Sequence, residues 1–150
     1  MRSTGKILSV ACALLALGLP SQANSFECFT GPFIIAFDSD IAYVDEEARN
    51  ILDRVSRLAA NCGYGRTVIE GHADTRENPA LGRRRAKVVR AYLSAHGIPE
   101  DDIDIKARGA SRQRLATGAN VAERQNRRVE ISFHPIFAPL PAKARAKPQP

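Results

Sequence analysis

An α/β fold, equally describable as α+β, is predicted for this chain: helices packed on a four-stranded mixed sheet, in the order β-α-β-α-β-α-β. Three observations predict it. Strand-like apolar runs alternate with segments of helical periodicity. Polar breaks containing Gly, Pro or Asn separate these segments. The length of 150 residues, with 44% hydrophobic and 25% charged content, suits one folded domain with short extensions.

The first half of the domain is predicted to contain a strand, a helix and a second strand. Residues 32–37 form a continuous apolar run, typical of a strand buried on both faces. Asp45 is placed to cap a helix whose apolar residues follow an amphipathic spacing up to residue 59. Residues 61–65 end this helix, and residues 66–70 follow as a strand that Gly71 is expected to break.

The second half is predicted to contain a helix, a strand, a short helix and a last strand. A polar loop over 72–80 leads into the helix, 81–96, which Gly97 ends. Residues 103–107 alternate between apolar and polar, typical of a strand with one face in water. A polar loop over 109–118 and a short helix over 120–125 precede the last strand, residues 129–133.

Residues 1–23 have the pattern of a secretory signal peptide, with basic residues first, a short apolar run over 7–19 and small residues at 21–23. The folded domain is therefore expected over residues 24–134. Residues 135–150 are rich in Pro, Ala and Lys and are expected to form a disordered tail. An uncleaved membrane anchor is an alternative, but the apolar run is shorter than the roughly 20 residues that span a bilayer. Lipidation at Cys12 is another, but Ser9 stands where an aliphatic residue would be expected.

Secretion would leave Cys28 and Cys62 in an oxidising compartment. A disulfide between them is favoured, and it would tie the entry to the first strand to the end of the first helix. Two unpaired thiols are the alternative.

The charge balance is basic, with 22 Lys and Arg against 16 Asp and Glu. A basic protein outside the cytoplasm meets anionic membranes or cell-wall polymers. The absence of Trp and the low aromatic content argue against a platform on which nucleic-acid bases stack, and nucleic acid is not expected as a partner.

Residues 68–93 concentrate the chemistry of the chain in a strand, a polar loop and a basic helix. Asp74 follows the strand end, and Arg85 shares the apolar helix face of Leu81 and Val89. A guanidinium on an apolar face needs a partner, because an unpaired buried charge is costly. One anion and one cation can therefore face the same small volume. The alternatives are that Asp74 caps the helix or pairs with Arg76, and that Arg85 is a solvated helix charge.

Two other pairs of polar residues are explained more simply by a structural role than by a functional one. His72 and Asp74 suggest a metal site, but the chain holds three widely separated His, so no metal or other cofactor is expected and His72 is expected to be a structural hydrogen-bonder under the loop. Asp38 and Asp40 suggest acid–base catalysis, but acids at a strand end are more often turn formers. The chain is therefore not expected to be an enzyme.

Several motifs, in this order, resemble the OmpA-like C-terminal domain family, including its peptidoglycan-associated members. They are Gly71-His72-Ala73-Asp74, Leu81-Gly82, Arg85-Ala86, Gly97-Ile98-Pro99 and Asn126-Arg127-Arg128-Val129-Glu130-Ile131. The resemblance covers residues 33–133.

The resemblance implies non-catalytic binding of peptidoglycan in the periplasm, through the meso-diaminopimelate of the stem peptide. That residue ends in a free ammonium and a free carboxylate. The family pattern assigns Asp74 to the ammonium and Arg85 to the carboxylate, which an arginine fork binds bidentately. The remaining positions that the resemblance places at the ligand are Phe37, Asp38, Asp40, Ala73, Asn78 and Arg128.

One departure from the family supports a second hypothesis. The loop between Asp74 and Arg85 is shorter than the family usually has. The alternative function is therefore an adaptor with this fold that has lost peptidoglycan binding. Its basic tail or residues 112–114 would then dock an outer-membrane or other envelope protein.

Overall fold

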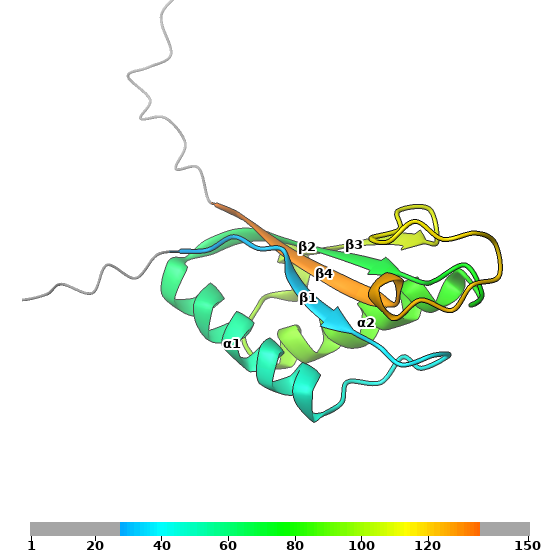
Figure 1. Cartoon of the computed structure of the whole chain (residues 1–150). Coiled ribbons are helices and arrows are strands. Elements are labelled where there is room, and N and C mark those ends of the chain that lie inside the picture. Colours follow the sequence, from blue (N-terminus) through cyan, green and yellow to red (C-terminus); the bar gives the residue numbers. More distant parts are fainter. Residues whose placement is uncertain (1–27, 136–150) are drawn as a thin grey trace, which may run out of the picture.

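The computed structural model describes residues 28–135 (Figure 1). The predicted signal peptide, 1–23, lies outside these residues, as does the predicted tail apart from Pro135, which closes the last strand. Within the described part of the chain, no helix is both long and apolar enough to span a bilayer. The elements in chain order are β1 (Phe33–Ala36), α1 (Glu46–Cys62), β2 (Tyr64–His72), α2 (Ala80–Ala95), η1 (Glu100–Asp102), β3 (Ile103–Gly109), η2 (Arg124–Asn126) and β4 (Arg128–Pro135).

The four strands form one mixed sheet, as predicted, in the order β1-β4-β2-β3. β2 and β3 are parallel, whereas β4 runs antiparallel to both β1 and β2. Both α-helices lie on one face of this sheet, so the domain has two layers (Figure 1). The opposite face carries no helix (Figure 1).

The hydrophobic core fills the space between the sheet and the helices. Alternate strand residues point into it, because side chains of a strand alternate between the two faces. Ile35, Ile69, Val129 and Ile131 are all fully buried there. The helices contribute their apolar stripes, with Ala48, Leu52, Val55, Ala86, Val89 and Leu93 all at most 4% exposed.

β1 is an edge strand, and the prediction that it is buried on both faces is wrong. It pairs only with β4, and Ile35 is its one buried residue. The alternate residues Ile34 and Ala36 lie on the face that no helix covers and are only half-buried. An apolar run alone cannot distinguish a central strand from an edge strand whose outer face is partly exposed.

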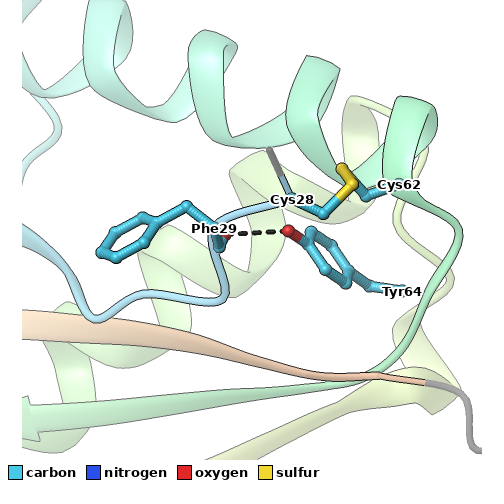
Figure 2. Close-up of a disulfide and its surroundings, with 4 residues drawn as sticks. All are labelled: Cys28, Phe29, Cys62 and Tyr64. Atoms are coloured by element: carbon cyan, nitrogen blue, oxygen red, sulfur yellow. Dashed lines mark hydrogen bonds between the residues drawn. A yellow bond between two sulfur atoms is a disulfide. The ribbon is translucent and has the colours of Figure 1, made fainter. Parts of the chain in front are cut away.

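α1 has the predicted ends. The Asp45 carboxylate accepts a hydrogen bond from the backbone N–H of Ala48 at 2.8 Å, and Gly63 ends the helix with φ at +58°. The predicted disulfide joins Cys28 to Cys62 with a Cα–Cα distance of 5.7 Å (Figure 2). Beside it, the Tyr64 hydroxyl donates to the Phe29 carbonyl at 2.8 Å (Figure 2). The bridge therefore fixes the chain that enters β1 against the end of α1.

Gly71 does not break the second strand, contrary to the prediction, because β2 continues to His72. Gly71 serves a close approach instead: a Cβ built on it would lie 1.9 Å from the carbonyl oxygen of Gly82 in α2. A Cβ on Gly82 would lie 2.5 Å from the Gly71 carbonyl oxygen. The two glycines let the first turn of α2 rest on the backbone of β2, which brings Arg85 to the strand end.

The third predicted helix, over 120–125, is reduced to the short 3₁₀ turn η2. Its last residue, Asn126, is fully buried and ties down the long loop that precedes it. The Asn126 side chain accepts from the N–H groups of Arg114 and Leu115 and donates to the Leu115 carbonyl. The bonds of Asn126 therefore hold the polar loop that was predicted over 109–118, and only η2 is found near the predicted helix.

Candidate binding site at the turn between β2 and α2

Asp74 lies two residues after the end of β2 and is fully buried. The N–H of Ala73 donates to the carbonyl of Gly109 at 3.0 Å, so the chain stays attached to β3 beyond the end of the strand. Ala73 is 1% exposed and Asp74 0%. The sequence-predicted anion is thus anchored at this turn, but its side chain is closed to solvent.

The Asp74 carboxylate has a complete set of partners. One oxygen accepts from the N–H groups of Arg76 and Glu77, at 3.0 and 2.9 Å. The other accepts from the N–H of Glu123 at 3.0 Å and from Nη1 of Arg127 at 2.9 Å. Burial by itself raises the pKa of Asp74, but the Arg127 bond and the backbone N–H groups outweigh it and hold the pKa below its usual value.

Arg85 is fully buried, as its position on the apolar helix face predicted. Its Nε donates to the carbonyl of Ile41 at 2.8 Å. Nη1 and Nη2 donate to the carbonyls of His72 and Asp38, at 3.2 and 3.0 Å. The guanidinium carbon lies 5.2 Å from the ring centroid of Phe37, a favourable cation–π distance. These contacts fix the plane and the direction of the guanidinium.

Glu77 is the carboxylate partner of Arg85. Its two oxygens accept from Nη1 and Nη2 at 2.7 and 2.6 Å, which is the bidentate fork. The same carboxylate also accepts from the N–H of Asp40 at 2.8 Å and from the N–H of Asp74 at 3.3 Å. The Glu77 side chain is 1% exposed. The guanidinium and two backbone N–H groups together form a receptor for one carboxylate, and the chain itself fills it.

The site therefore contains two ion pairs, Asp74–Arg127 and Glu77–Arg85, and these four formal charges sum to zero. Asp74 and Arg85 do not contact each other directly; the Glu77 carboxylate bonds both the Arg85 guanidinium and the Asp74 N–H. Chemically, the turn offers one position for a carboxylate and one for a cation, each with an internal group in place.

Other residues predicted at the site contribute mainly through their backbone or their packing. Phe37 lies against the guanidinium, Asp38 supplies a carbonyl and Asp40 an N–H, while both aspartate side chains are exposed. The Asn78 side chain accepts from the N–H of Ala80 at 2.9 Å and orders the entry to α2.

Arg128 lies apart from these residues. It is paired in register with Ala36, on the sheet face that no helix covers. Its guanidinium donates to the carboxylate of Glu130 at 2.6 Å and to the carbonyl of Arg112 at 3.2 Å. Arg127, its neighbour in sequence, is the arginine that reaches Asp74.

Sequence reasoning missed Glu77 and Arg127 as members of this cluster. The short loop was the feature that could have indicated Glu77. With few residues between Asp74 and the helix, an acid within the loop must lie close to Arg85. Arg127 gave no comparable signal, since two adjacent arginines at the start of a strand do not reveal which one faces inward.

His72 is not the hydrogen-bonder that was expected. It is 1% exposed, and neither ring nitrogen has a hydrogen-bond partner among residues 28–135. Burial, reinforced by the charge of Arg128, lowers the pKa of His72. The ring is therefore a neutral packing element under the loop.

Several known proteins are similar to this chain in sequence. An outer membrane protein of Gluconacetobacter diazotrophicus is 31% identical over 112 residues, covering 68% of this chain and 30% of that protein. The peptidoglycan-associated lipoprotein of Pseudomonas aeruginosa is 39% identical over 100 residues, covering 63% of this chain and 58% of that protein. The chain thus spans less than two thirds of the length of either relative.

A solved structure agrees in fold. The peptidoglycan-associated lipoprotein of Burkholderia pseudomallei superposes with a TM-score of 0.61 at 23% identity, covering 67% of this chain and 89% of that one. The model of the OmpA family matches residues 36–128, which include every element from the end of β1 to the start of β4. The chain belongs to the OmpA family.

Proposed function

We propose that this protein is a non-catalytic peptidoglycan-binding module of the cell envelope, acting in the periplasm. It binds the diaminopimelate of the stem peptide at the turn between β2 and α2. Relatives named as peptidoglycan-associated lipoproteins support the ligand class, and a relative named as an outer membrane protein supports the location.

The observation that carries the proposal is the receptor around the Glu77 carboxylate. Arg85 and the N–H groups of Asp40 and Asp74 hold that carboxylate from all sides. At the neighbouring position, Asp74 holds the guanidinium of Arg127. A free diaminopimelate end carries one carboxylate and one ammonium, so it matches both internal partners in kind of charge.

Binding is then an exchange of partners. Glu77 turns out to solvent and the ligand carboxylate takes its four hydrogen bonds, while the ligand ammonium replaces the Arg127 guanidinium on Asp74. The buried charge stays at zero throughout, which avoids the cost of an unpaired buried ion. Opening the two internal pairs lowers the apparent affinity for a single stem. Retention on the wall comes from the many identical stems.

Sedimentation with purified sacculi, with free meso-diaminopimelate as competitor, tests the proposal. Arg85→Lys keeps the charge but loses the fork, and Asp74→Asn keeps the shape but loses the charge. Each is expected to reduce co-sedimentation. Arg84→Lys and Asp101→Asn change exposed residues in the same way and are the matched controls. Binding by both site variants at the wild-type level would refute the assignment.

A second candidate function rests on the closure of the same site. Asp74 and Arg85 are each 0% exposed, and Arg85 already has a bidentate carboxylate. If Glu77 never leaves, the domain is an adaptor that binds an envelope protein. A folded wild-type protein that fails to sediment with sacculi, together with a Glu77→Ala variant that also fails, would favour this function over peptidoglycan binding.

A further inference from the structure

The sheet face that carries no helix holds a cavity of about 360 Å³ beside the edge strand β1. Its lining residues are Ile34, Ala36, Arg114, Arg124, Gln125 and Arg128. Small-molecule sites commonly begin at about this volume, roughly 300 Å³. The cavity shares no lining residue with the turn at Asp74 and Arg85.

Register pairing defines the floor of this cavity. Ala36 lies opposite Arg128, and Ile34 opposite Glu130, in the antiparallel pairing of β1 with β4. All four residues therefore occupy the same face, since Ile35 and Val129 between them belong to the core on the other side. The floor is apolar at Ile34 and Ala36 and cationic at Arg128.

The loop before β4 supplies the other two arginines. The buried Asn126 side chain accepts from the N–H of Arg114 at 2.8 Å, which fixes the backbone of Arg114 beside the start of β4. Arg124 opens the turn η2. Neither Arg114 nor Arg124 forms an ion pair with any residue of the described chain. Both are exposed and available to a ligand.

Arg128 is 5% exposed and has an incomplete set of acceptors. Nε bonds the Glu130 carboxylate and Nη2 the Arg112 carbonyl, but the buried Nη1 has no hydrogen-bond partner within residues 28–135. Buried guanidinium N–H groups normally have acceptors, so Arg128, which lines the cavity, keeps one donor for an oxygen of a ligand.

The charges decide which anion suits the cavity. Arg114, Arg124 and Arg128 carry three positive charges, and Glu130, which pairs with Arg128, carries one negative charge. The surplus of two matches a phosphate monoester, whose charge near neutral pH is about −1.5 to −2. Several arginine forks also suit the three terminal oxygens of such a group better than the two of a carboxylate.

We propose that this cavity binds a phosphate monoester attached to a small apolar or sugar body. The phosphate contacts the three arginines, and the attached body rests on Ile34 and Ala36. The cavity shares no lining residue with the peptidoglycan site, although Glu123 and Arg127, which bond Asp74, are neighbours in sequence of Arg124 and Arg128. A lipid head group and a soluble phosphorylated metabolite share this chemistry, and the experiment separates them.

Calorimetry of the full-length protein with phenyl phosphate tests the proposal. The wild type is expected to bind it, and the Arg114→Ala/Arg124→Ala variant is expected to bind it roughly tenfold or more weakly, because two charge-assisted hydrogen bonds are lost. Arg83→Ala/Arg84→Ala removes the same charge from exposed positions of α2 and is expected to bind like the wild type. Ala36→Phe keeps every charge but fills the floor, and it is expected to abolish binding.

Flotation with phosphatidylcholine vesicles, with and without phosphatidic acid, identifies the source. Binding to phosphatidic acid that phenyl phosphate displaces supports a lipid monoester. Binding of phenyl phosphate without flotation supports a soluble one. Undetectable phenyl phosphate binding by the wild type would overturn the proposal. So would equal binding by the wild type and the Arg114→Ala/Arg124→Ala variant, or by the Ala36→Phe variant, because either result indicates diffuse surface charge.

Discussion

The carboxylate of Glu77 accepts from both terminal nitrogens of Arg85, at 2.7 and 2.6 Å, with both side chains almost completely buried. This pair stands where the OmpA-like resemblance leads one to expect an arginine open to a ligand. The domain therefore contains its own carboxylate at the position proposed for diaminopimelate, and any ligand competes with Glu77 before it reaches Arg85.

Removal of Arg85 is expected to destabilise the fold severely. Arg85→Ala leaves Glu77 as a buried charge without its partner, which costs about 3–5 kcal/mol. Arg84→Ala, on the exposed face of the same helix turn, is expected to change the free energy of unfolding by less than about 0.5 kcal/mol. Urea denaturation of both variants measures the difference. Equal stability of the two variants would show that the buried pair does not form in solution.

The contact between Gly71 and Gly82 is expected to tolerate no side chain. Gly71→Ala places a Cβ 1.9 Å from the Gly82 carbonyl oxygen, so α2 must move away from β2, at a cost of roughly 2 kcal/mol or more. Gly118→Ala is the control, since a Cβ there meets nothing within 4 Å. A thermal melt of each variant tests this expectation. A Gly71→Ala protein as stable as Gly118→Ala would contradict the close packing.

Acid is expected to weaken the fold through His72. Burial and the charge of Arg128 lower the pKa of His72 from its ordinary value of 6.5, while Glu70 and Glu130 partly oppose the shift. From pH 6.5 down to the lowered pKa of the folded chain, the unfolded chain therefore binds a proton that the folded chain does not. The free energy of unfolding must then fall as the pH falls, by at most about 1.4 kcal/mol per pH unit for one proton.

His72→Phe removes this titrating group and is expected to flatten the dependence below about pH 6.5. His96→Phe is the control, because His96 is partly exposed. Urea titrations across this pH range supply the measurement. An unchanged slope in His72→Phe would mean that His72 does not have a lowered pKa.

Loss of the disulfide is expected to lower the free energy of unfolding by about 3–4 kcal/mol, on the chain-entropy estimate for the 34-residue separation of Cys28 and Cys62. The Cys28→Ser/Cys62→Ser variant, compared with the oxidised wild type in urea, measures this loss. The reduced wild type should match the variant. A double variant as stable as the oxidised wild type would show that the bridge constrains nothing in the unfolded chain.

An element of the fold could be predicted from the sequence where a local pattern of residues was enough to identify it. The cap at Asp45 and the alternation of Val129 with Ile131 each fix an element without help from the rest of the chain. The extent of β2 could not be predicted in this way. Gly71 looks like a strand breaker locally, and only its contact with Gly82 in a distant helix shows why a glycine continues the strand.

Asp74 and Arg85 could be predicted as members of the site, but Glu77, Arg127 and the pairing of the charges could not. The apolar helix face correctly required that Arg85 be buried with a partner. Which acid that partner would be depends on the path of the shortened loop, and the loop brings Glu77 to the guanidinium. Asp74 in turn pairs with Arg127, which lies 53 residues away along the chain, a contact that only the tertiary fold creates.

Calorimetric binding of meso-diaminopimelate to Glu77→Ala, beside the wild type, tests the central claim most directly. Truncation of Glu77 vacates the carboxylate position and leaves Arg85 held by the carbonyls of Ile41, Asp38 and His72. The account predicts that Glu77→Ala binds the ligand more tightly than the wild type, and that addition of Arg85→Lys removes this gain. A folded Glu77→Ala protein with no higher affinity than the wild type would contradict it.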